Sequence, residues 1–99
     1  MILTTTNSIE GFKIVDYLGI VTGVAMNEET IAMSFSASKY YKKIQESVDK
    51  VKEAAFQRLH ENARQLKANA VVGITVEVEL TTSNYPMVSV TGTAVKVVE

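Results

Sequence analysis

The stretch LKANAVVGITVEVEL, residues 66–80, changes its hydrophobic periodicity partway along and decides the fold. Up to Leu66 the pattern is that of a charged amphipathic helix, and from Val72 apolar and polar residues alternate as they do in a strand. This alternation puts Glu77 and Glu79 together on the strand face opposite the apolar one. The apolar face consists of Val72, Ile74, Val76, Val78 and Leu80.

A long helix precedes this strand. Apolar residues at spacings of three and four predict a helix from about Lys39 to Lys67. Lys39, Lys42 and Lys43 crowd its start, where positive charge opposes the helix dipole. Asn69, which tolerates a left-handed conformation, is the predicted end of the helix. The apolar stripe consists of Ile44, Val48, Val51, Ala55, Leu59, Ala63 and Leu66.

Two further strands are predicted, one near each end of the chain. Residues 12–25 and 87–98 are rich in β-branched residues, and both faces of each strand are partly apolar. Gly19 and Gly23 predict a bend, a bulge or close packing in the first of them. Residues 27–38, between this strand and the long helix, are left without an assigned conformation, although Asn27 followed by Glu28 and Glu29 is compatible with the start of a short helix.

These elements predict a single domain over residues 1–99 with an α+β fold, in which one long amphipathic helix lies across one face of a long antiparallel β-sheet. The helix cannot also cover the opposite face. That face carries apolar residues on the first and last strands, namely Tyr17, Val21, Val95 and Val97. Exposed apolar surface and long unpaired strand edges favour association between copies of the chain, so we expect a homo-oligomer.

Composition narrows the range of partners. The chain has 99 residues and a net charge of -1, with a pI near 5.8, so its charge favours neither nucleic acid nor an anionic membrane as a partner. It has no cysteine, which removes disulfides, thiolate metal ligands and a cysteine nucleophile. The sequence shows neither a signal peptide nor an apolar run long enough for a membrane helix, and we expect a cytoplasmic protein.

Three segments together resemble one protein family. They are TTTNSIEGFKIVDYLGIVTG at residues 4–23, KANAVVGITVEVE at 67–79 and MVSVTGTAVKV at 87–97. In this order they resemble the YbjQ-like family, small proteins of unknown function labelled "putative heavy-metal-binding". The resemblance implies a dodecin-subunit-like fold whose subunits assemble through sheet contacts into a ring of five.

The sequence departs from the family pattern at several positions. SFSASKYYKK, residues 34–43, stands where many members carry a Gly-Gly-Arg loop. Lys67 replaces a glycine that is usual at the end of the helix, and Val51–Lys52 replaces an Ala-Arg pair. Glu77–Val78–Glu79 stands in place of Asp-Tyr-Glu. The chain is therefore predicted to be a divergent member.

Glu77 and Glu79 are the candidate metal ligands. Their Cβ atoms should lie about 7 Å apart, and a ring would gather several copies of the pair around a hard cation such as Ca²⁺ or Mg²⁺. The alternative, which we favour, is a solvated strand face with Lys96 as the cross-strand partner. His60 is the only histidine, and a soft metal prefers Cys, Met or several His. We therefore expect a surface histidine.

Two other groups allow both a functional and a structural interpretation. Asp16 projects on the side of Ile14 and Leu18 as either a buried acid or, as we favour, a residue at a strand bulge or hydrogen-bonded to a turn. Tyr40 and Tyr41 lie beside three lysines, a pattern that base stacking also uses. A packed pair of rings at the start of the helix, with solvated lysines, is the favoured interpretation.

The sequence predicts assembly but no reaction. No nucleophile, base and orienting group can be placed together, so no catalytic residue and no cofactor is assigned, and a metal ion is suggested by the family resemblance alone. The expected function is that of a ring-forming binding or scaffold protein that holds a small ligand or metal ion at subunit interfaces. The alternative is an enzyme with an acidic site between subunits, built from Asp16, Glu77, Glu79 or His60.

Overall fold

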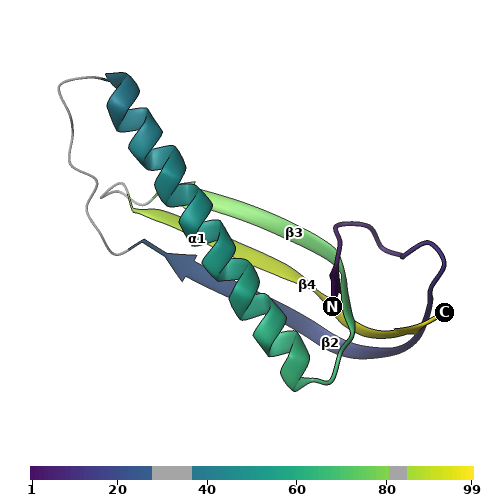
Figure 1. Ribbon diagram of the computed structural model, residues 1–99. Coiled ribbons are helices and arrows are strands. Elements are labelled where there is room, and N and C mark those ends of the chain that lie inside the picture. The colour runs from purple at the N-terminus through teal and green to yellow at the C-terminus, as the bar shows by residue number, and fades with distance from the viewer. Residues whose placement is uncertain (28–36, 81–84) are drawn as a thin grey trace.

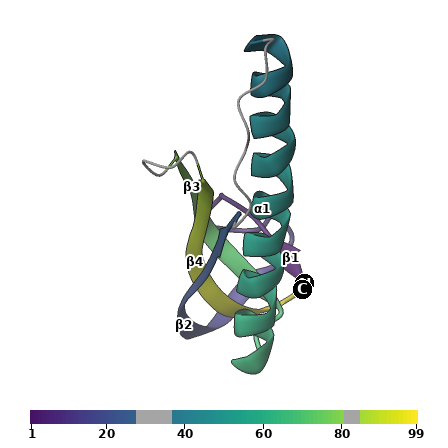
Figure 2. The ribbon, with the colours of Figure 1, turned by 90° about the vertical axis from the view of Figure 1, so that its left-hand side faces the viewer.

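A computed structural model describes residues 1–27, 37–80 and 85–99 and shows two layers, a sheet and one helix (Figure 1). The predicted α+β architecture is confirmed, because a single helix packs across one face of the sheet (Figure 2). The segment 27–38, which the sequence leaves unassigned, lies almost wholly outside the described residues. The elements in chain order are β1 (Ile2–Leu3), β2 (Lys13–Met26), α1 (Ala37–Gln65), β3 (Ala70–Leu80) and β4 (Pro86–Val98).

The sheet has four strands in the order β1-β3-β4-β2. The three long strands pair antiparallel, as predicted. The short strand β1, which the sequence analysis did not predict, lies parallel to β3 and makes the sheet mixed. β4 is the central long strand, so β2 and the outer part of β3 form the two long edges of the sheet.

The main core lies between α1 and the sheet. Small residues in the predicted stripe let the helix lie close to the strands, and Leu59 is completely buried there. The closest approach is at Gly23 in β2, where an added Cβ would overlap the carbonyl oxygen of Ala55 and lie 2.6 Å from the amide nitrogen of Leu59. The predicted close packing at Gly23 is therefore confirmed. The buried members of this core are Val21, Ala25, Val51, Ala55, Leu59, Ala63, Val71, Ile74, Val88, Val90 and Ala94.

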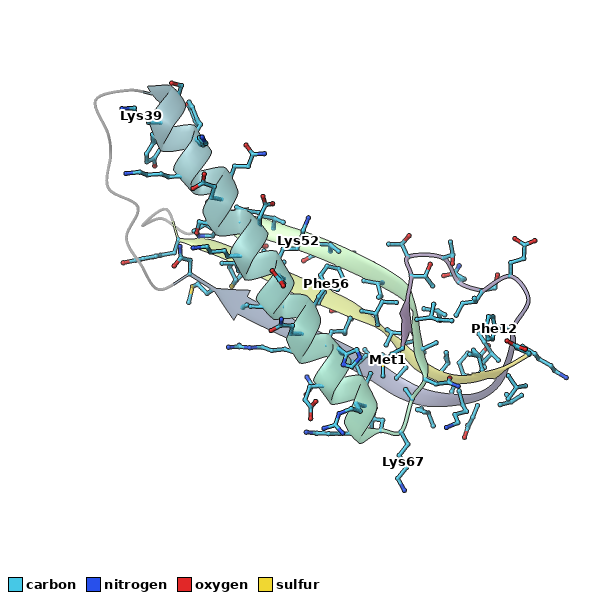
Figure 3. The ribbon with its side chains drawn as sticks, in the orientation of Figure 1. Met1, Phe12, Lys39, Lys52, Phe56 and Lys67 are labelled. Atoms are coloured by element: carbon cyan, nitrogen blue, oxygen red, sulfur yellow. The ribbon has the colours of Figure 1, made fainter. Side chains whose placement is uncertain are left out.

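A second cluster lies on the opposite face of the sheet, which we call the far face. The N-terminal segment folds over this face near the beginning of β2 and covers half of it, which the sequence analysis did not predict. Phe12 and Ile9 pack here from the segment that leads into β2 (Figure 3). The buried strand residues of this cluster are Ala70, Val72, Val95 and Val97.

Bulges change two of the predicted strand faces. Gly73 has φ 62°, and the pairing of β3 with β4 shifts between Val72 and Thr75. The extra residue turns Val72 into the far-face cluster and Ile74 toward the helix, so the prediction that they share a face is wrong. A similar shift in β2, beside Gly19, turns Leu18 toward the helix.

The corner from α1 into β3 also differs from the prediction. Lys67, not Asn69, takes the left-handed conformation, with φ 66°. Asn69 instead clamps the end of β4, because its Oδ1 accepts from Val97 N at 2.8 Å and its Nδ2 donates to Val97 O at 2.9 Å. The Asn69 side chain thus bonds both main-chain groups of a residue far away in the sequence, and local sequence does not reveal such a contact.

Candidate functional site

Glu77 and Glu79 lie on the far face of β3, and both are exposed. Val76 and Val78, which alternate with the two glutamates along β3, stand opposite Val90 and Val88, and these two valines are buried under the helix. Strand alternation therefore turns the two carboxylates to the other side together, as predicted.

The predicted cross-strand partner of these carboxylates is wrong. Ser89 stands opposite Glu77, and Met87 stands opposite Glu79. Lys96 lies opposite Asp16 at the other end of the sheet, and its Nζ donates to Lys67 O at 3.4 Å. The register of the paired strands, which includes shifts at the bulges, decides which residues are opposite, so spacing alone misplaced the lysine.

The half of the far face that the N-terminal segment leaves uncovered is here called the open face. Its register is settled by the pairing of three strands, and a row of threonine hydroxyls crosses it, with Thr22 Oγ1 and Thr91 Oγ1 3.3 Å apart. Ile20 is 79% exposed on it, although a β-branched apolar residue is usually buried. The open face consists of Ile20, Thr22, Val24 and Met26 from β2, Met87, Ser89 and Thr91 from β4, and Thr75, Glu77 and Glu79 from β3.

The open face is divided by chemistry. The β2 side is apolar through Ile20, Val24 and Met26, all of them exposed, and the β3 side is acidic through Glu77 and Glu79. Uninterrupted alternation places Val21 on the far face, but the bulge at Gly19 turns Val21 under the helix and leaves the even-numbered residues from Ile20 to Met26 on the open face. In the sequence, the alternating residues from Ile20 to Met26 were the feature that could have predicted this face. Such a face suits a partner that offers both apolar groups and cations.

The described residues do not assemble a heavy-metal site. No group of three or more His, Cys, Asp or Glu side chains gathers among residues 1–27, 37–80 and 85–99. A soft metal prefers thiolate or imidazole ligands, and this chain has no cysteine and one histidine. The carboxylates of Glu77 and Glu79 suit a hard cation better, but Ca²⁺ takes six to eight oxygen ligands, which this pair does not supply.

His60 lies on the helix side of the sheet, away from the two glutamates. It is exposed, as predicted, and borders an open hollow of about 340 Å³ beside β1. The hollow is lined by Leu3, Glu53, Phe56, Gln57 and His60.

Asp16 is exposed at the register shift that follows Ile14 in β2. The bulge interpretation is confirmed, and the buried-acid interpretation is wrong. Asp16 lies near the start of the sheet, Glu77 and Glu79 near its other end, and His60 beyond the opposite face. One chain therefore does not bring together the four residues of the predicted acidic site.

The start of α1 is basic and carries two tyrosines. The rings of Tyr40 and Tyr41 lie 5.9 Å apart at an interplanar angle of 60°, which confirms the predicted packed pair. Lys39, Lys42 and Lys43 are exposed, and the first turn has no acidic residue (Figure 3). Tyr41 is 68% exposed, so the apolar surface of the helix continues beyond the core.

One ion pair shifts ionisation near the other end of α1. Arg64 Nη2 donates to Glu61 Oε1 at 2.7 Å, and Arg64 Nε donates to Glu61 Oε2 at 3.0 Å. These hydrogen bonds to Arg64 lower the pKa of Glu61 and raise that of Arg64. Both side chains are exposed, so the pair decorates the helix and does not build a site.

Two helix side chains close part of the β2 edge. Arg58 Nη1 donates to Val24 O at 2.6 Å, and Asn62 Nδ2 donates to Thr22 O at 2.8 Å. Their spacing of four residues places both on the β2 side of α1. The sequence analysis assigned them no role, and only the i,i+4 pair of polar residues beside the apolar stripe could have suggested one.

Comparison with known proteins identifies similar sequences over the whole chain. A family model named YbjQ and described as "putative heavy-metal-binding" matches residues 1–98. A UPF0145 protein of Bacillus cereus is 37% identical and covers 98% of this chain and 100% of its own. A UPF0145 protein of Anoxybacillus flavithermus is 38% identical over the full length of both chains.

A solved structure supports the fold. A crystal structure from Pediococcus pentosaceus, titled as a protein of unknown function of the DUF74 family, matches with a TM-score of 0.72. It covers 99% of this chain and 98% of its own at 20% identity, so the likeness concerns the fold. Among the described residues, no helix has both the length and the hydropathy needed to cross a membrane.

Proposed function

The chain belongs to the YbjQ family, described as "putative heavy-metal-binding", and on that premise we propose that it is a ring-forming, non-catalytic binding or scaffold protein. Residues 1–99 act as one domain in this proposal, and five copies close the ring, the number implied by the family resemblance. A small ligand or cation is held where subunits meet. The absence of cysteine is compatible with the reducing cytoplasm, where we place the protein.

The observation that carries the proposal is the uncovered open face. Val24 and Met26 are exposed apolar neighbours on this face of β2, and Ile20 is exposed on the same face beyond Thr22. Exposed apolar groups that adjoin one another mark an interaction surface, whereas isolated ones are ordinary. One helix, about 10 Å across, covers about two strands spaced 4.8 Å apart, and α1 lies on the other face of the sheet.

The size and shape of the chain also favour assembly. Its accessible surface is 6698 Å², whereas a compact monomer of 10.8 kDa exposes about 5,500 Å². The excess exceeds the roughly 800 Å² that each partner buries in a standard interface. The radius of gyration is 16.3 Å, against about 13 Å for a compact domain of this length. A subunit of this form gains burial when copies surround it.

The metal part of the family description needs ligands from several copies in this proposal. Because the described residues of one chain gather no three metal-ligating side chains, a metal site in this proposal draws on more than one copy. Glu77 and Glu79 remain the candidates for a hard cation. A thermal-shift series with Zn²⁺, Cu²⁺, Ca²⁺ and Mg²⁺ tests this, with E77Q/E79Q as the comparison. A Ca²⁺ or Mg²⁺ shift that the double variant retains would remove both residues from the site.

The mass in solution tests assembly. Sedimentation velocity at micromolar concentration should give about 54 kDa, five times the chain mass of 10.8 kDa. Ile20→Glu, which places a charge on the open face, should reduce the mass to that of a single chain. Val15→Glu is the matched control, because Val15 is an exposed apolar residue of the same strand outside the open face. A wild-type protein that sediments as one chain overturns the proposal.

A further inference from the structure

The composition of the open face indicates that its occupant carries positive charge. Its β2 side is apolar, and its β3 side presents Glu77 and Glu79. If two open faces were stacked on each other, the carboxylates would be buried without cations, which is strongly unfavourable. The occupant must therefore bring apolar side chains and basic side chains together on one element.

The N-terminal turns of α1 have this composition. We call residues 38–48 the overhang, because they precede Val51, the first residue of α1 in the main core, and the start of α1 extends past the ends of the strands (Figures 1 and 2). Tyr41 is exposed on the overhang, and Tyr40 and Ile44 are only partly buried. Its basic residues, all exposed, are Lys39, Lys42 and Lys43.

The overhang cannot cover the open face of its own copy. In one chain α1 packs on the helix side of β2 and β4, and the sheet itself separates the helix from the far face. A second copy has no such restriction. The occupant that matches the open face in both polarity and charge is thus another molecule of the same chain.

We propose that the overhang of one copy docks on the open face of the next, with its tyrosines and Ile44 on Ile20, Val24 and Met26 and its lysines beside Glu77 and Glu79. This inference rests on the homo-oligomer proposed above and names its contact. The overhang of eleven residues is about 16 Å long and 10 Å across. It fits within a three-strand face whose seven-residue β2 segment is about 23 Å long.

The contact is head-to-tail. Each copy offers an overhang and receives one, so the two surfaces in contact differ, and a chain of such contacts closes into a ring when the rotation per copy permits. The lysine and glutamate pairs select the partner and its orientation, while the apolar contacts supply most of the burial.

Charge reversal tests the contact. K42E/K43E reverses two charges on the overhang, and E77K/E79K reverses two on the open face. Each double variant should raise the dissociation constant of the assembly at least about tenfold, because attraction becomes repulsion at the interface. The quadruple variant, which carries both reversals in one chain, should recover assembly.

The control is K50E/K52E, which makes the same charge change on exposed lysines of α1 outside the overhang. It should assemble as the wild type does. Circular dichroism of every variant reports whether α1 is formed, so loss of the helix is distinguished from loss of the contact.

Each outcome decides between the two proposals. A wild-type protein that is a single chain overturns both of them. An oligomeric wild type whose double variants assemble unchanged overturns the docking of the overhang and leaves the ring intact. Double variants that dissociate while the folded quadruple variant fails to recover also overturn it, since the two charge sets would then act at separate contacts.

Discussion

The two long edges of the sheet are finished differently. On β2, the carbonyls of Thr22 and Val24 already accept hydrogen bonds from Asn62 and Arg58 of α1. On β3, the N-terminal segment bonds the edge only as far as Ile74, whose N donates to Thr4 O. No hydrogen bond between described residues is seen on the outer side of β3 from Thr75 onward.

The difference follows from where the helix lies. α1 packs mainly on β2 and β4 and barely touches β3, so only the β2 edge is within reach of its side chains. Asn27 N donates to Pro86 O, which shows which main-chain groups of β4 point toward β2 and which point toward β3. The same alternation turns the main-chain groups of Val76 and Val78 outward on β3. Among the described residues, the β2 edge is therefore partly capped by the helix, and the outer part of the β3 edge is left to pair with a neighbour.

The largest expected effect on the free energy of unfolding contrasts the main core with the exposed end of β3. Leu59 is 0% exposed on the sheet-facing side of α1, whereas Leu80 at the end of β3 is 53% exposed. Leu59→Ala should lower the free energy of unfolding by about 4 kcal/mol, because it leaves a cavity in the main core. Leu80→Ala should lower it by less than about 1 kcal/mol. Urea unfolding at one protein concentration measures both losses. Equal losses would contradict the description of the end of β3 as exposed.

Gly23→Ala attacks the contact that brings α1 close to β2. The new methyl group would overlap the carbonyl oxygen of Ala55, and the main chain cannot yield easily. We expect a loss of about 3 kcal/mol in unfolding free energy. Gly11→Ala is the control, since it meets nothing within 4 Å and is strained only through its φ of 82°. A control that costs as much as Gly23→Ala would show that close packing is not the cause.

Arg58→Ala opens the β2 edge directly. Loss of the bond to the Val24 carbonyl should cost about 1 kcal/mol, and an uncapped edge should aggregate faster on heating. Arg64→Ala is matched to it, because Arg64 lies on the same helix but its side chain bonds the exposed Glu61 and not a strand carbonyl. Unfolding free energy and light scattering should both be nearly unchanged in the control. If the two variants behave alike, the cap on the β2 edge has no role.

Sequence patterns predicted the parts of this arrangement that depend on local spacing. The helix stripe, the two faces of β4 and the shared face of Glu77 and Glu79 all follow from periodicity. The bulge at Gly73 was not predictable from alternation, because one extra residue exchanges the faces of Val72 and Ile74 without changing their composition.

Long-range contacts account for most of what the sequence did not predict. Cover of half the far face by the N-terminal segment, and the clamp of Asn69 on Val97, need strand pairings that only the fold supplies. The open face likewise depends on register, which places Ser89 and Met87 beside the glutamates where spacing had suggested Lys96.

Lys67→Gly probes the corner that links the covered helix to the open strand. Lys67 holds φ 66°, a conformation that costs an L-residue about 1 kcal/mol and that glycine adopts freely. Glycine also loses more chain entropy on folding, so the net gain in stability should be about 0.5 kcal/mol. A small rise in the urea midpoint measures it, with Gln57→Gly, at an exposed position inside the helix, as a control that should lower the midpoint. A fall on Lys67→Gly would mean that the lysine side chain stabilises the corner.

The smallest effect concerns the exposed pair at Glu61, which lies on the helix but on neither edge. Arg64 lowers the pKa of Glu61 in the folded chain, so the carboxylate contributes stability above its unfolded pKa and loses that contribution as pH falls through the lowered folded pKa. Compared with Glu61→Gln, the wild type should have a slightly higher Tm at pH 7, and the difference should vanish in acid. Because both side chains are exposed, salt should weaken the difference further. If the Tm difference persists in acid or in high salt, Glu61 stabilises the helix by packing and not by charge. The C-terminal end of α1 would then be less exposed to solvent than its contacts indicate.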